Sequence, residues 1–126
     1  MNIFEANKTN MKQNFINISK IVEQFGNLED VKEVLDFFLT EIPESLENLK
    51  MALKNENWEK LYQYAHFLKG SCQSMAVEKC AVFLESLGNE AKKNQNITKM
   101  QTLIEQIIFE LDNASQEIQH FLAKNK

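Results

Sequence analysis

The chain has 126 residues, of which 44% are hydrophobic and 25% are charged, proportions that are ordinary for a soluble globular domain. Its net charge of -4 argues against nucleic-acid binding, which requires a basic face that displaces counterions, and no apolar run approaches the length needed to cross a membrane. The first residues also lack the charged-then-apolar pattern of a signal peptide, so we expect a cytoplasmic protein.

With 3 glycines and 1 proline the chain has few residues for turns, which favours a few long helices over many short strands. Residues 1–13 are polar and aperiodic, and we predict a flexible N-terminal arm there. A single domain is predicted over residues 14–126. It begins with a short helix over roughly 14–25, for which Gly26 provides the end.

A second helix is predicted to begin after Asn27, which can cap it, and to extend to about residue 53. Its apolar residues recur at steps of three and four, as expected for one buried helix face. Pro43 lies inside this pattern. We expect it to bend or divide the helix, because proline has no N–H to donate and its ring clashes with the preceding turn.

Three more amphipathic segments predict three more helices: one from Asn55 or Asn57 to about Ser74, one over roughly 77–93, and one that begins at a capping box formed by Thr98 and Gln101. The phenylalanine and methionine residues are assigned to the core. Because short connections place neighbouring helices antiparallel, the predicted fold is all-α: an up-down antiparallel four-helix bundle with an additional short N-terminal helix.

Cysteine and lysine usage limits the chemistry of the chain. Cys72 and Cys80 fall on apolar stripes of predicted helices, so we expect buried free thiols rather than a disulfide. Their spacing matches no zinc-ligand pattern. All 14 basic residues are lysine, so any phosphate contact is made by a point charge and not by a planar guanidinium.

The chain is also rich in asparagine. Asn-x-Ser/Thr triplets, the pattern of glycosylation acceptors, begin at Asn7, Asn17, Asn96 and Asn113. For a cytoplasmic protein we interpret these triplets as chance products of the composition.

The most informative segment lies in the third predicted helix, where residues 65–71 read Ala-His-Phe-Leu-Lys-Gly-Ser. At about 100° per residue, one stripe of this helix is polar and contains Glu59, Tyr62, His66, Lys69, Gly70 and Gln73. The opposite stripe is apolar and complete without the histidine. We therefore expect the imidazole to point into solvent.

Gly70 needs a reason, because glycine in a helix interior costs about 1 kcal/mol relative to alanine. A functional reason is the close approach of another molecule to the backbone at this position. Neutral imidazole offers a lone pair near pH 7, and Lys69, one turn from His66, can reach an anionic group bound to that ring. The pattern indicates a histidine that holds a phosphoryl group while a partner docks beside it.

Residues 65–72 resemble the signature of histidine-containing phosphotransfer (HPt) domains, which are four-helix modules that relay phosphoryl groups in two-component signalling. The resemblance extends upstream to Phe-Leu-Thr-Glu-Ile-Pro at residues 38–43 and downstream to residues 84–87. It covers roughly residues 14–95, and His-x-Leu-Lys-Gly on a helix is its most specific part.

The resemblance implies that His66 is the phosphoacceptor, modified on its outer ring nitrogen. It also implies that Lys69 offsets the charge of the phosphoryl group and that Gly70 leaves room for a receiver domain. The polar stripe itself adds three candidates, one for a hydrogen bond to the imidazole or the phosphoryl oxygens and two for contact with the partner: Gln73, Tyr62 and Glu59.

Two positions depart from the family pattern. Many members have glycine where this chain has Ala76, a change from which we expect little effect. Many also have Glu or Gln, close to the histidine, where this chain has Gly88. The polar group that would orient the ring is therefore missing, or is supplied by Gln73, Glu85 or water.

The sequence has no carboxylate cluster beside the histidine, no glycine-rich nucleotide loop and no kinase motif. We therefore predict a phosphocarrier rather than an autonomous catalyst, with no metal or cofactor of its own. The resemblance implies that Mg²⁺ is bound by the partner receiver domain. The expected partners are a response-regulator receiver domain, a hybrid sensor histidine kinase or both, and the chain is expected to be a monomer.

The leading hypothesis is a histidine phosphotransfer protein of a two-component phosphorelay, in which His66 exchanges a phosphoryl group with a receiver-domain aspartate. One alternative is a non-phosphorylated HPt-like binding module that regulates a receiver or a kinase. Another is the phosphoacceptor domain for a chemotaxis-type kinase. The other histidine, His120, lies beside the seam of the last predicted helix and is assigned to packing or surface.

Overall fold

The computed structural model describes residues 14–126, and in this range the chain forms helices and no strands. The helices are α2 (Ile18–Phe25), α3 (Leu28–Lys54), α4 (Trp58–Ser74), α5 (Glu78–Lys92) and α6 (Ile97–Lys124). The predicted all-α class is confirmed. The arm predicted over residues 1–13 lies outside the described residues, and no helix within 14–126 is long and apolar enough to cross a membrane.

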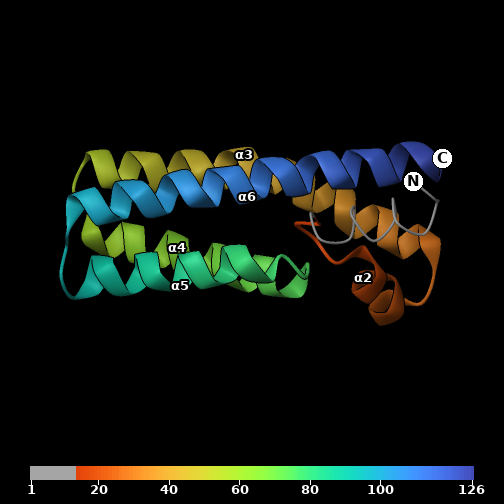
Figure 1. Cartoon of the computed structure of the whole chain (residues 1–126), viewed down its shortest axis with the longest axis horizontal. Coiled ribbons are helices and arrows are strands. Elements are labelled where there is room, and N and C mark those ends of the chain that lie inside the picture. The colour runs from red at the N-terminus through yellow and green to blue at the C-terminus, as the bar shows by residue number, and fades with distance from the viewer. Residues whose placement is uncertain (1–13) are drawn as a thin grey trace, which may run out of the picture.

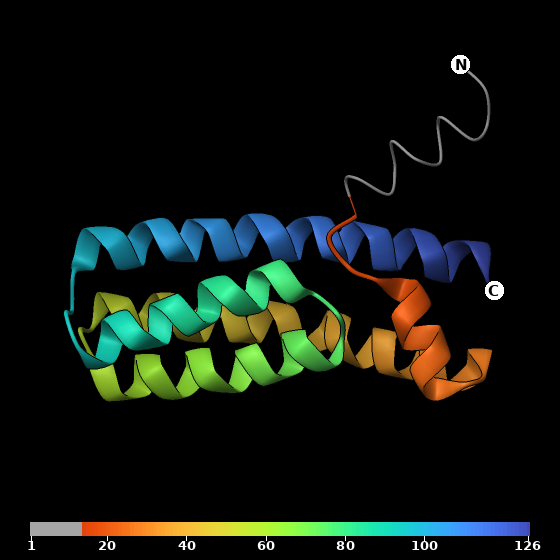
Figure 2. The same cartoon turned by 60° about the horizontal axis from the view of Figure 1, so that its bottom comes forward.

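Helices α3 to α6 run alternately up and down and form an antiparallel four-helix bundle (Figure 1). Each packs against the next, and α6 returns to pack against α3. With 27 and 28 residues, α3 and α6 extend beyond α4 and α5, which have 17 and 15. The short helix α2 packs against α3 at this overhang (Figure 2), as the predicted additional N-terminal helix.

Asparagine caps four of the five helices in the described part of the chain. The side-chain oxygens of Asn17, Asn27, Asn57 and Asn96 each accept a hydrogen bond of 2.9–3.1 Å from the backbone N–H three residues on. Such a cap contributes about 1 kcal/mol. The capping box predicted at Thr98 is wrong, because Asn96 caps α6, which begins at Ile97, and Thr98 lies in its first turn.

The segment before α2 is not helical as predicted, since α2 begins at Ile18 and not near residue 14. The N–H groups of Phe15 and Ile16 instead donate to the Glu117 carboxylate of α6, with shortest distances of 2.8 and 3.3 Å. This contact ties the start of the described chain to the bundle. Gly26 ends α2 in the left-handed conformation, with φ of 79°, as its position predicted.

Pro43 does not divide α3, which is continuous from Leu28 to Lys54. Pro43 is exposed, so the carbonyl that loses its helical hydrogen bond lies on the side where water can replace it. Its neighbours Ile42 and Leu46 are buried and keep the helix packed on both sides of the proline. Tertiary packing therefore holds together a helix that the local sequence would interrupt.

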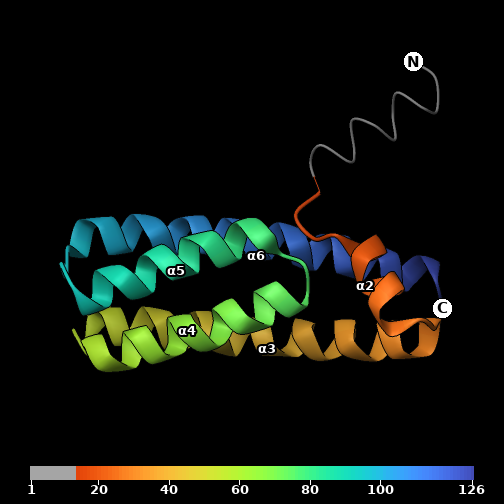
Figure 3. The same cartoon turned by 90° about the horizontal axis from the view of Figure 1, so that it is seen from below.

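The core contains both cysteines as buried free thiols, which confirms that prediction. A hydrogen bond with Cys72 and burial raise the pKa of the Cys80 thiol far above its ordinary value, so Cys80 stays protonated and unreactive. Cys72 belongs to α4 and Cys80 to α5, two helices that pack side by side (Figure 3). The core cysteines are therefore not candidates for a reactive group, and the candidate residues lie on the exposed face of α4.

Candidate functional site

Helix α4 buries one face and presents the other to solvent, as its sequence predicted. Its buried residues are Leu61, Ala65, Leu68 and Cys72. His66 is exposed on the opposite side, Gly70 is exposed one turn later, and Lys69 is half-buried between them. An imidazole, a positive charge and a bare stretch of backbone therefore share one accessible patch.

The imidazole of His66 is in contact with an aromatic ring. Tyr62, one turn earlier on α4, stacks on it with ring centroids 5.8 Å apart and planes inclined by 18°. Stacked pairs at this separation contribute about 0.5–1.5 kcal/mol. On α5, the Lys92 ammonium lies 4.2 Å from the centre of the Tyr62 ring, within cation–π distance. Side chains of two helices thus form a continuous stack that ends at the histidine.

Gly88 of α5 lies beside this stack. A Cβ atom added at Gly88 would lie 3.5 Å from Cδ1 and 3.7 Å from Cε1 of Tyr62, and 4.0 Å from the Cβ atom of Ala65. These are ordinary van der Waals distances, so a methyl group fits at this buried glycine beside the tyrosine ring.

Gly70 has a different setting. A Cβ atom added there would meet nothing within 4 Å, and its φ is not positive, so neither packing nor backbone conformation requires a glycine. The loss of about 1 kcal/mol relative to alanine is therefore not compensated within the described chain. What Gly70 provides is an unobstructed surface one turn from His66.

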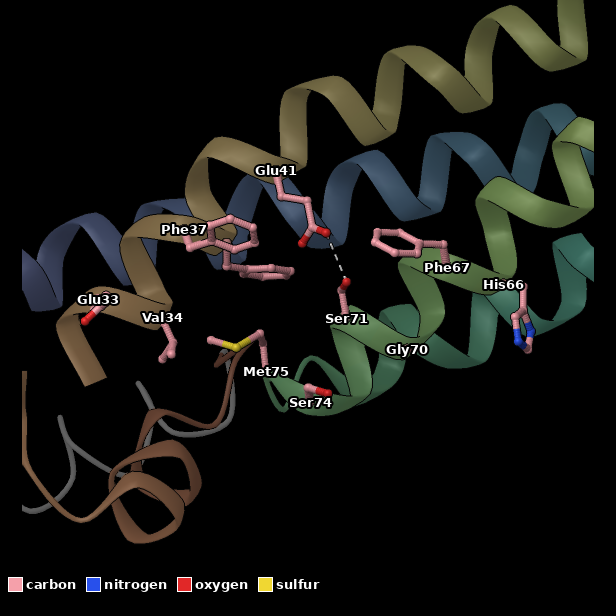
Figure 4. Close-up of a pocket in the computed structure, with 11 residues that line it drawn as sticks. Glu33, Val34, Phe37, Glu41, His66, Phe67, Gly70, Ser71, Ser74 and Met75 are labelled. Atoms are coloured by element: carbon pink, nitrogen blue, oxygen red, sulfur yellow. Dashed lines mark hydrogen bonds between the residues drawn. The ribbon is translucent and has the colours of Figure 1, made fainter. Parts of the chain in front are cut away.

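An apolar groove of about 750 Å³ opens between α3 and α4 with His66 at one end (Figure 4). Phe37 of α3 and Phe67 of α4 line it and are 69% and 64% exposed. Between them Ser71 donates a hydrogen bond of 3.2 Å to the Glu41 carboxylate. The assignment of the phenylalanines and methionines to the core is wrong for these two, and also for Phe109 and Met51, which are 58% and 45% exposed. Exposed aromatic side chains beside a cavity are typical of a surface that binds a partner.

The remaining residues of the predicted stripe, Glu59 and Gln73, lie farther from His66 along α4. Glu59 is exposed in the first turn of α4, and Gln73 is exposed two turns beyond the histidine. Within residues 14–126 no hydrogen bond joins the Gln73 amide to the imidazole. His120 is exposed on α6, outside the groove. The structure therefore places Tyr62 in contact with His66 and Gly70 beside it on the groove, while Lys69 lies one turn along the helix from His66.

Across residues 14–126, no group of three or more His, Cys, Asp or Glu side chains is arranged to hold a metal ion.

Comparison with known proteins identifies the family. Residues 33–121, most of the chain, match the family model described as Hpt domain. The chain belongs to the Hpt domain family. The match runs from α3 into α6, so it includes both walls of the groove and all of α4. The site of this Hpt domain is therefore built from the part of the chain that the family shares, whereas α2 lies outside it.

Individual relatives agree with this assignment. Over 62 residues the chain is 32% identical to the phosphorelay intermediate protein YPD1 of Candida albicans, a match that covers 49% of this chain and 34% of the relative. The chain thus corresponds to about a third of that relative's length.

Two solved structures share the fold. The histidine-containing phosphotransfer protein B (HptB) of Pseudomonas aeruginosa PAO1 aligns with a TM-score of 0.79 and 20% identity, over 87% of this chain and 96% of HptB. The HPT domain of the Hpt sensor hybrid histidine kinase from Shewanella aligns with a TM-score of 0.74 and 17% identity, over 87% and 95%. These similarities confirm the helical bundle architecture of the Hpt domain.

Proposed function

We propose that this Hpt domain carries a phosphoryl group on His66 in a two-component phosphorelay and exchanges it with an aspartate of a receiver domain in the cytoplasm. The observation that carries the proposal is the unobstructed surface at Gly70, directly beside an exposed imidazole and an apolar groove. A carrier needs these features together, because its nucleophile must enter the active site of another protein. The name of the Candida relative, a phosphorelay intermediate, supports the same role.

In the proposed transfer one bond replaces another. The lone pair on Nε2 of His66 attacks phosphorus, the P–N bond forms as the P–O bond to the aspartate breaks, and the carboxylate leaves with the electron pair. Nδ1 keeps its hydrogen, so no strong base is needed at the moment of attack. Transfer in the opposite direction reverses these steps.

The partner is proposed to supply the remaining chemistry. In-line phosphoryl transfer needs a metal ion and acidic groups that hold the phosphoryl oxygens. A receiver domain with Mg²⁺ would bring both to His66, while this chain contributes the nucleophile, the Lys69 charge and the docking surface. On this proposal the protein is a phosphocarrier, and it acts as a monomer that binds receivers and hybrid kinases in turn.

The proposal is tested by mixing the protein with a phosphorylated receiver domain, using a panel of receivers from the same organism. The label is expected on this chain as a phosphoramidate, labile in acid and stable in base, and mass spectrometry is expected to map it to His66. Tight receiver binding without label would instead indicate a non-phosphorylated regulatory module. Labelling by a kinase domain with no receiver present would indicate a chemotaxis-type phosphoacceptor.

Replacing Lys69 with alanine is expected to slow transfer by about tenfold while leaving the fold intact. An ammonium one turn from His66 stabilises charge on the phosphoryl oxygens, but its partial exposure keeps the effect near 1–1.5 kcal/mol. The rate is measured in single turnover with a phosphorylated receiver. Lys60→Ala, which removes an exposed charge two turns earlier, is the matched control. Equal rates for the two variants would remove Lys69 from the mechanism.

Replacing Phe67 with glutamate is expected to weaken receiver binding by tenfold or more. The change puts a charge into the apolar groove that the partner is proposed to cover, and exposed aromatic anchors carry much of the energy of such interfaces. Binding is measured by titration with the receiver domain. Val82→Glu on α5 is the control, because Val82 is similarly exposed, at 61%, but does not line the groove. Equal weakening by both changes would argue against docking at the groove.

A further inference from the structure

We infer that Tyr62 is a positioning residue for the phosphoacceptor: its ring, seated on Gly88, takes the place of a polar partner and holds the His66 imidazole ready for transfer. This inference rests on the proposed function, because it concerns how the phosphorylated side chain is oriented. It assigns to Tyr62 a task different from contact with the partner.

The first support is the contact itself. Within residues 14–126 no hydrogen bond reaches the imidazole, whereas the Tyr62 ring stacks on it at 5.8 Å and 18°. An exposed histidine with no contact would rotate among rotamers and lose that freedom when it attacks phosphorus. A stacked ring restricts the imidazole before the partner arrives, which lowers the entropy lost on reaching the transition state.

The second support is the packing of the Tyr62 ring against Gly88. A Cβ atom added at Gly88 of α5 would lie 3.5 Å from the Tyr62 ring of α4, so the ring packs against the backbone of the neighbouring helix. The added Cβ atom would meet the ring at ordinary contact distance, so alanine also fits at this buried position. A small residue on α5 is therefore compatible with the Tyr62 ring beside the imidazole, whereas a large one would compete with the ring for the space.

The third support is the positive charge that borders the ring. The Lys92 ammonium lies 4.2 Å from the ring centre and favours the orientation in which the ring presents a face to it. Tyr62 is half-buried, so part of its ring is fixed by packing and part contacts Lys92 and His66. The position of the ring is thus determined by α5 as well as by α4, which makes it a firm support for the imidazole.

Stacking also suits a phosphoacceptor. It covers one face of the imidazole, while both nitrogens lie at the ring edge and stay accessible to the partner. Orientation is therefore achieved without burying the atom that reacts.

The experiment compares Tyr62→Phe, which keeps a ring, with Tyr62→Leu, which keeps apolar bulk without a ring. In the free protein, proton NMR is expected to show a ring-current shift of the His66 ring protons in wild type and Tyr62→Phe, and its loss in Tyr62→Leu. With a phosphorylated receiver at saturating concentration, Tyr62→Leu is expected to transfer three- to tenfold more slowly than wild type, about the rate equivalent of one stacked pair. Tyr62→Phe is expected to transfer at the wild-type rate, and the receiver concentration at half-maximal rate is expected to be unchanged.

A second pair of variants, both at Gly88 of α5, tests the same contact. Gly88→Ala fits beside the ring and is expected to behave as wild type, whereas Gly88→Leu displaces the ring and is expected to reproduce the Tyr62→Leu rate. Circular dichroism and thermal melts verify that each variant is folded. A Gly88→Leu variant that transfers at the wild-type rate would show that packing at Gly88 does not position the Tyr62 ring.

Other outcomes separate this inference from the proposed function. A wild-type rate for Tyr62→Leu, with label still on His66, would overturn the positioning role alone. So would a defect that disappears at saturating receiver, because Tyr62 would then be a docking contact. A wild-type protein that takes no label from any receiver would overturn the proposed function, and the positioning role with it.

Discussion

The His66→Gln variant is expected to take up no phosphoryl label above background from a phosphorylated receiver. Glutamine has similar size and polarity but no nucleophilic nitrogen, so no P–N bond can form. Because His66 is exposed and glutamine is a good helix former, the free energy of unfolding is expected to fall by no more than about 1 kcal/mol, mostly through loss of the stack on Tyr62. Label incorporation and a thermal melt, measured on the same preparation, separate loss of chemistry from loss of fold.

The chain supplies a matched control for this variant, because it contains 2 histidines. His120 is also exposed and helical, but it lies on α6 outside the groove. His120→Gln is expected to accept label at the wild-type rate. Label that persists in His66→Gln would contradict the assignment of the phosphoacceptor, and label lost only in His120→Gln would transfer that role to α6.

The second large effect is expected at Gly70, where stability and transfer should change in opposite directions. Gly70→Gln places a side chain on the surface that the partner approaches, and transfer is expected to fall about a hundredfold, equivalent to roughly 2.7 kcal/mol. The same change is expected to raise the free energy of unfolding by up to about 1 kcal/mol, because glutamine is a far better helix former than glycine and meets no neighbour. Single-turnover transfer and urea unfolding measure the two quantities.

Gly70→Ala is the graded control. A methyl group is expected to give most of the gain in stability with a much smaller loss of transfer, because it covers less of the surface. A Gly70→Gln variant that transfers at the wild-type rate would show that no partner approaches the backbone here. One that is less stable than wild type would show that Gly70 has a structural role that its open surroundings do not reveal.

The helices and the exposed face of α4 were predictable because burial follows the helical period along the chain. The same period placed His66 outside and Leu61, Leu68 and Cys72 inside, as the structure has them. Helix starts were less certain where two signals competed. Asn96 and Thr98 both resemble caps, and only the structure shows that the asparagine accepts the hydrogen bond. Two of the Asn-x-Ser/Thr triplets interpreted as chance thus have a structural use, since Asn17 and Asn96 are caps.

The contacts around the imidazole were not predictable, because they depend on how α4 and α5 are aligned with each other. The departure from the family pattern at Gly88 pointed to the correct place, but nothing in the sequence indicated that Tyr62 would fill it. Lys92 lies one turn after Gly88 on α5, but that spacing alone does not indicate that its ammonium reaches a ring on α4. Phe37 was assigned to the core by residue type alone.

The aromatic stack at the acceptor leaves one property of the ring undetermined. A carboxylate or amide partner would bind one imidazole nitrogen and thereby select a tautomer. A ring that touches only the face makes no such selection, and within residues 14–126 neither imidazole nitrogen has a hydrogen-bond partner. On the proposed function, the group that selects the tautomer is therefore one that the incoming domain supplies.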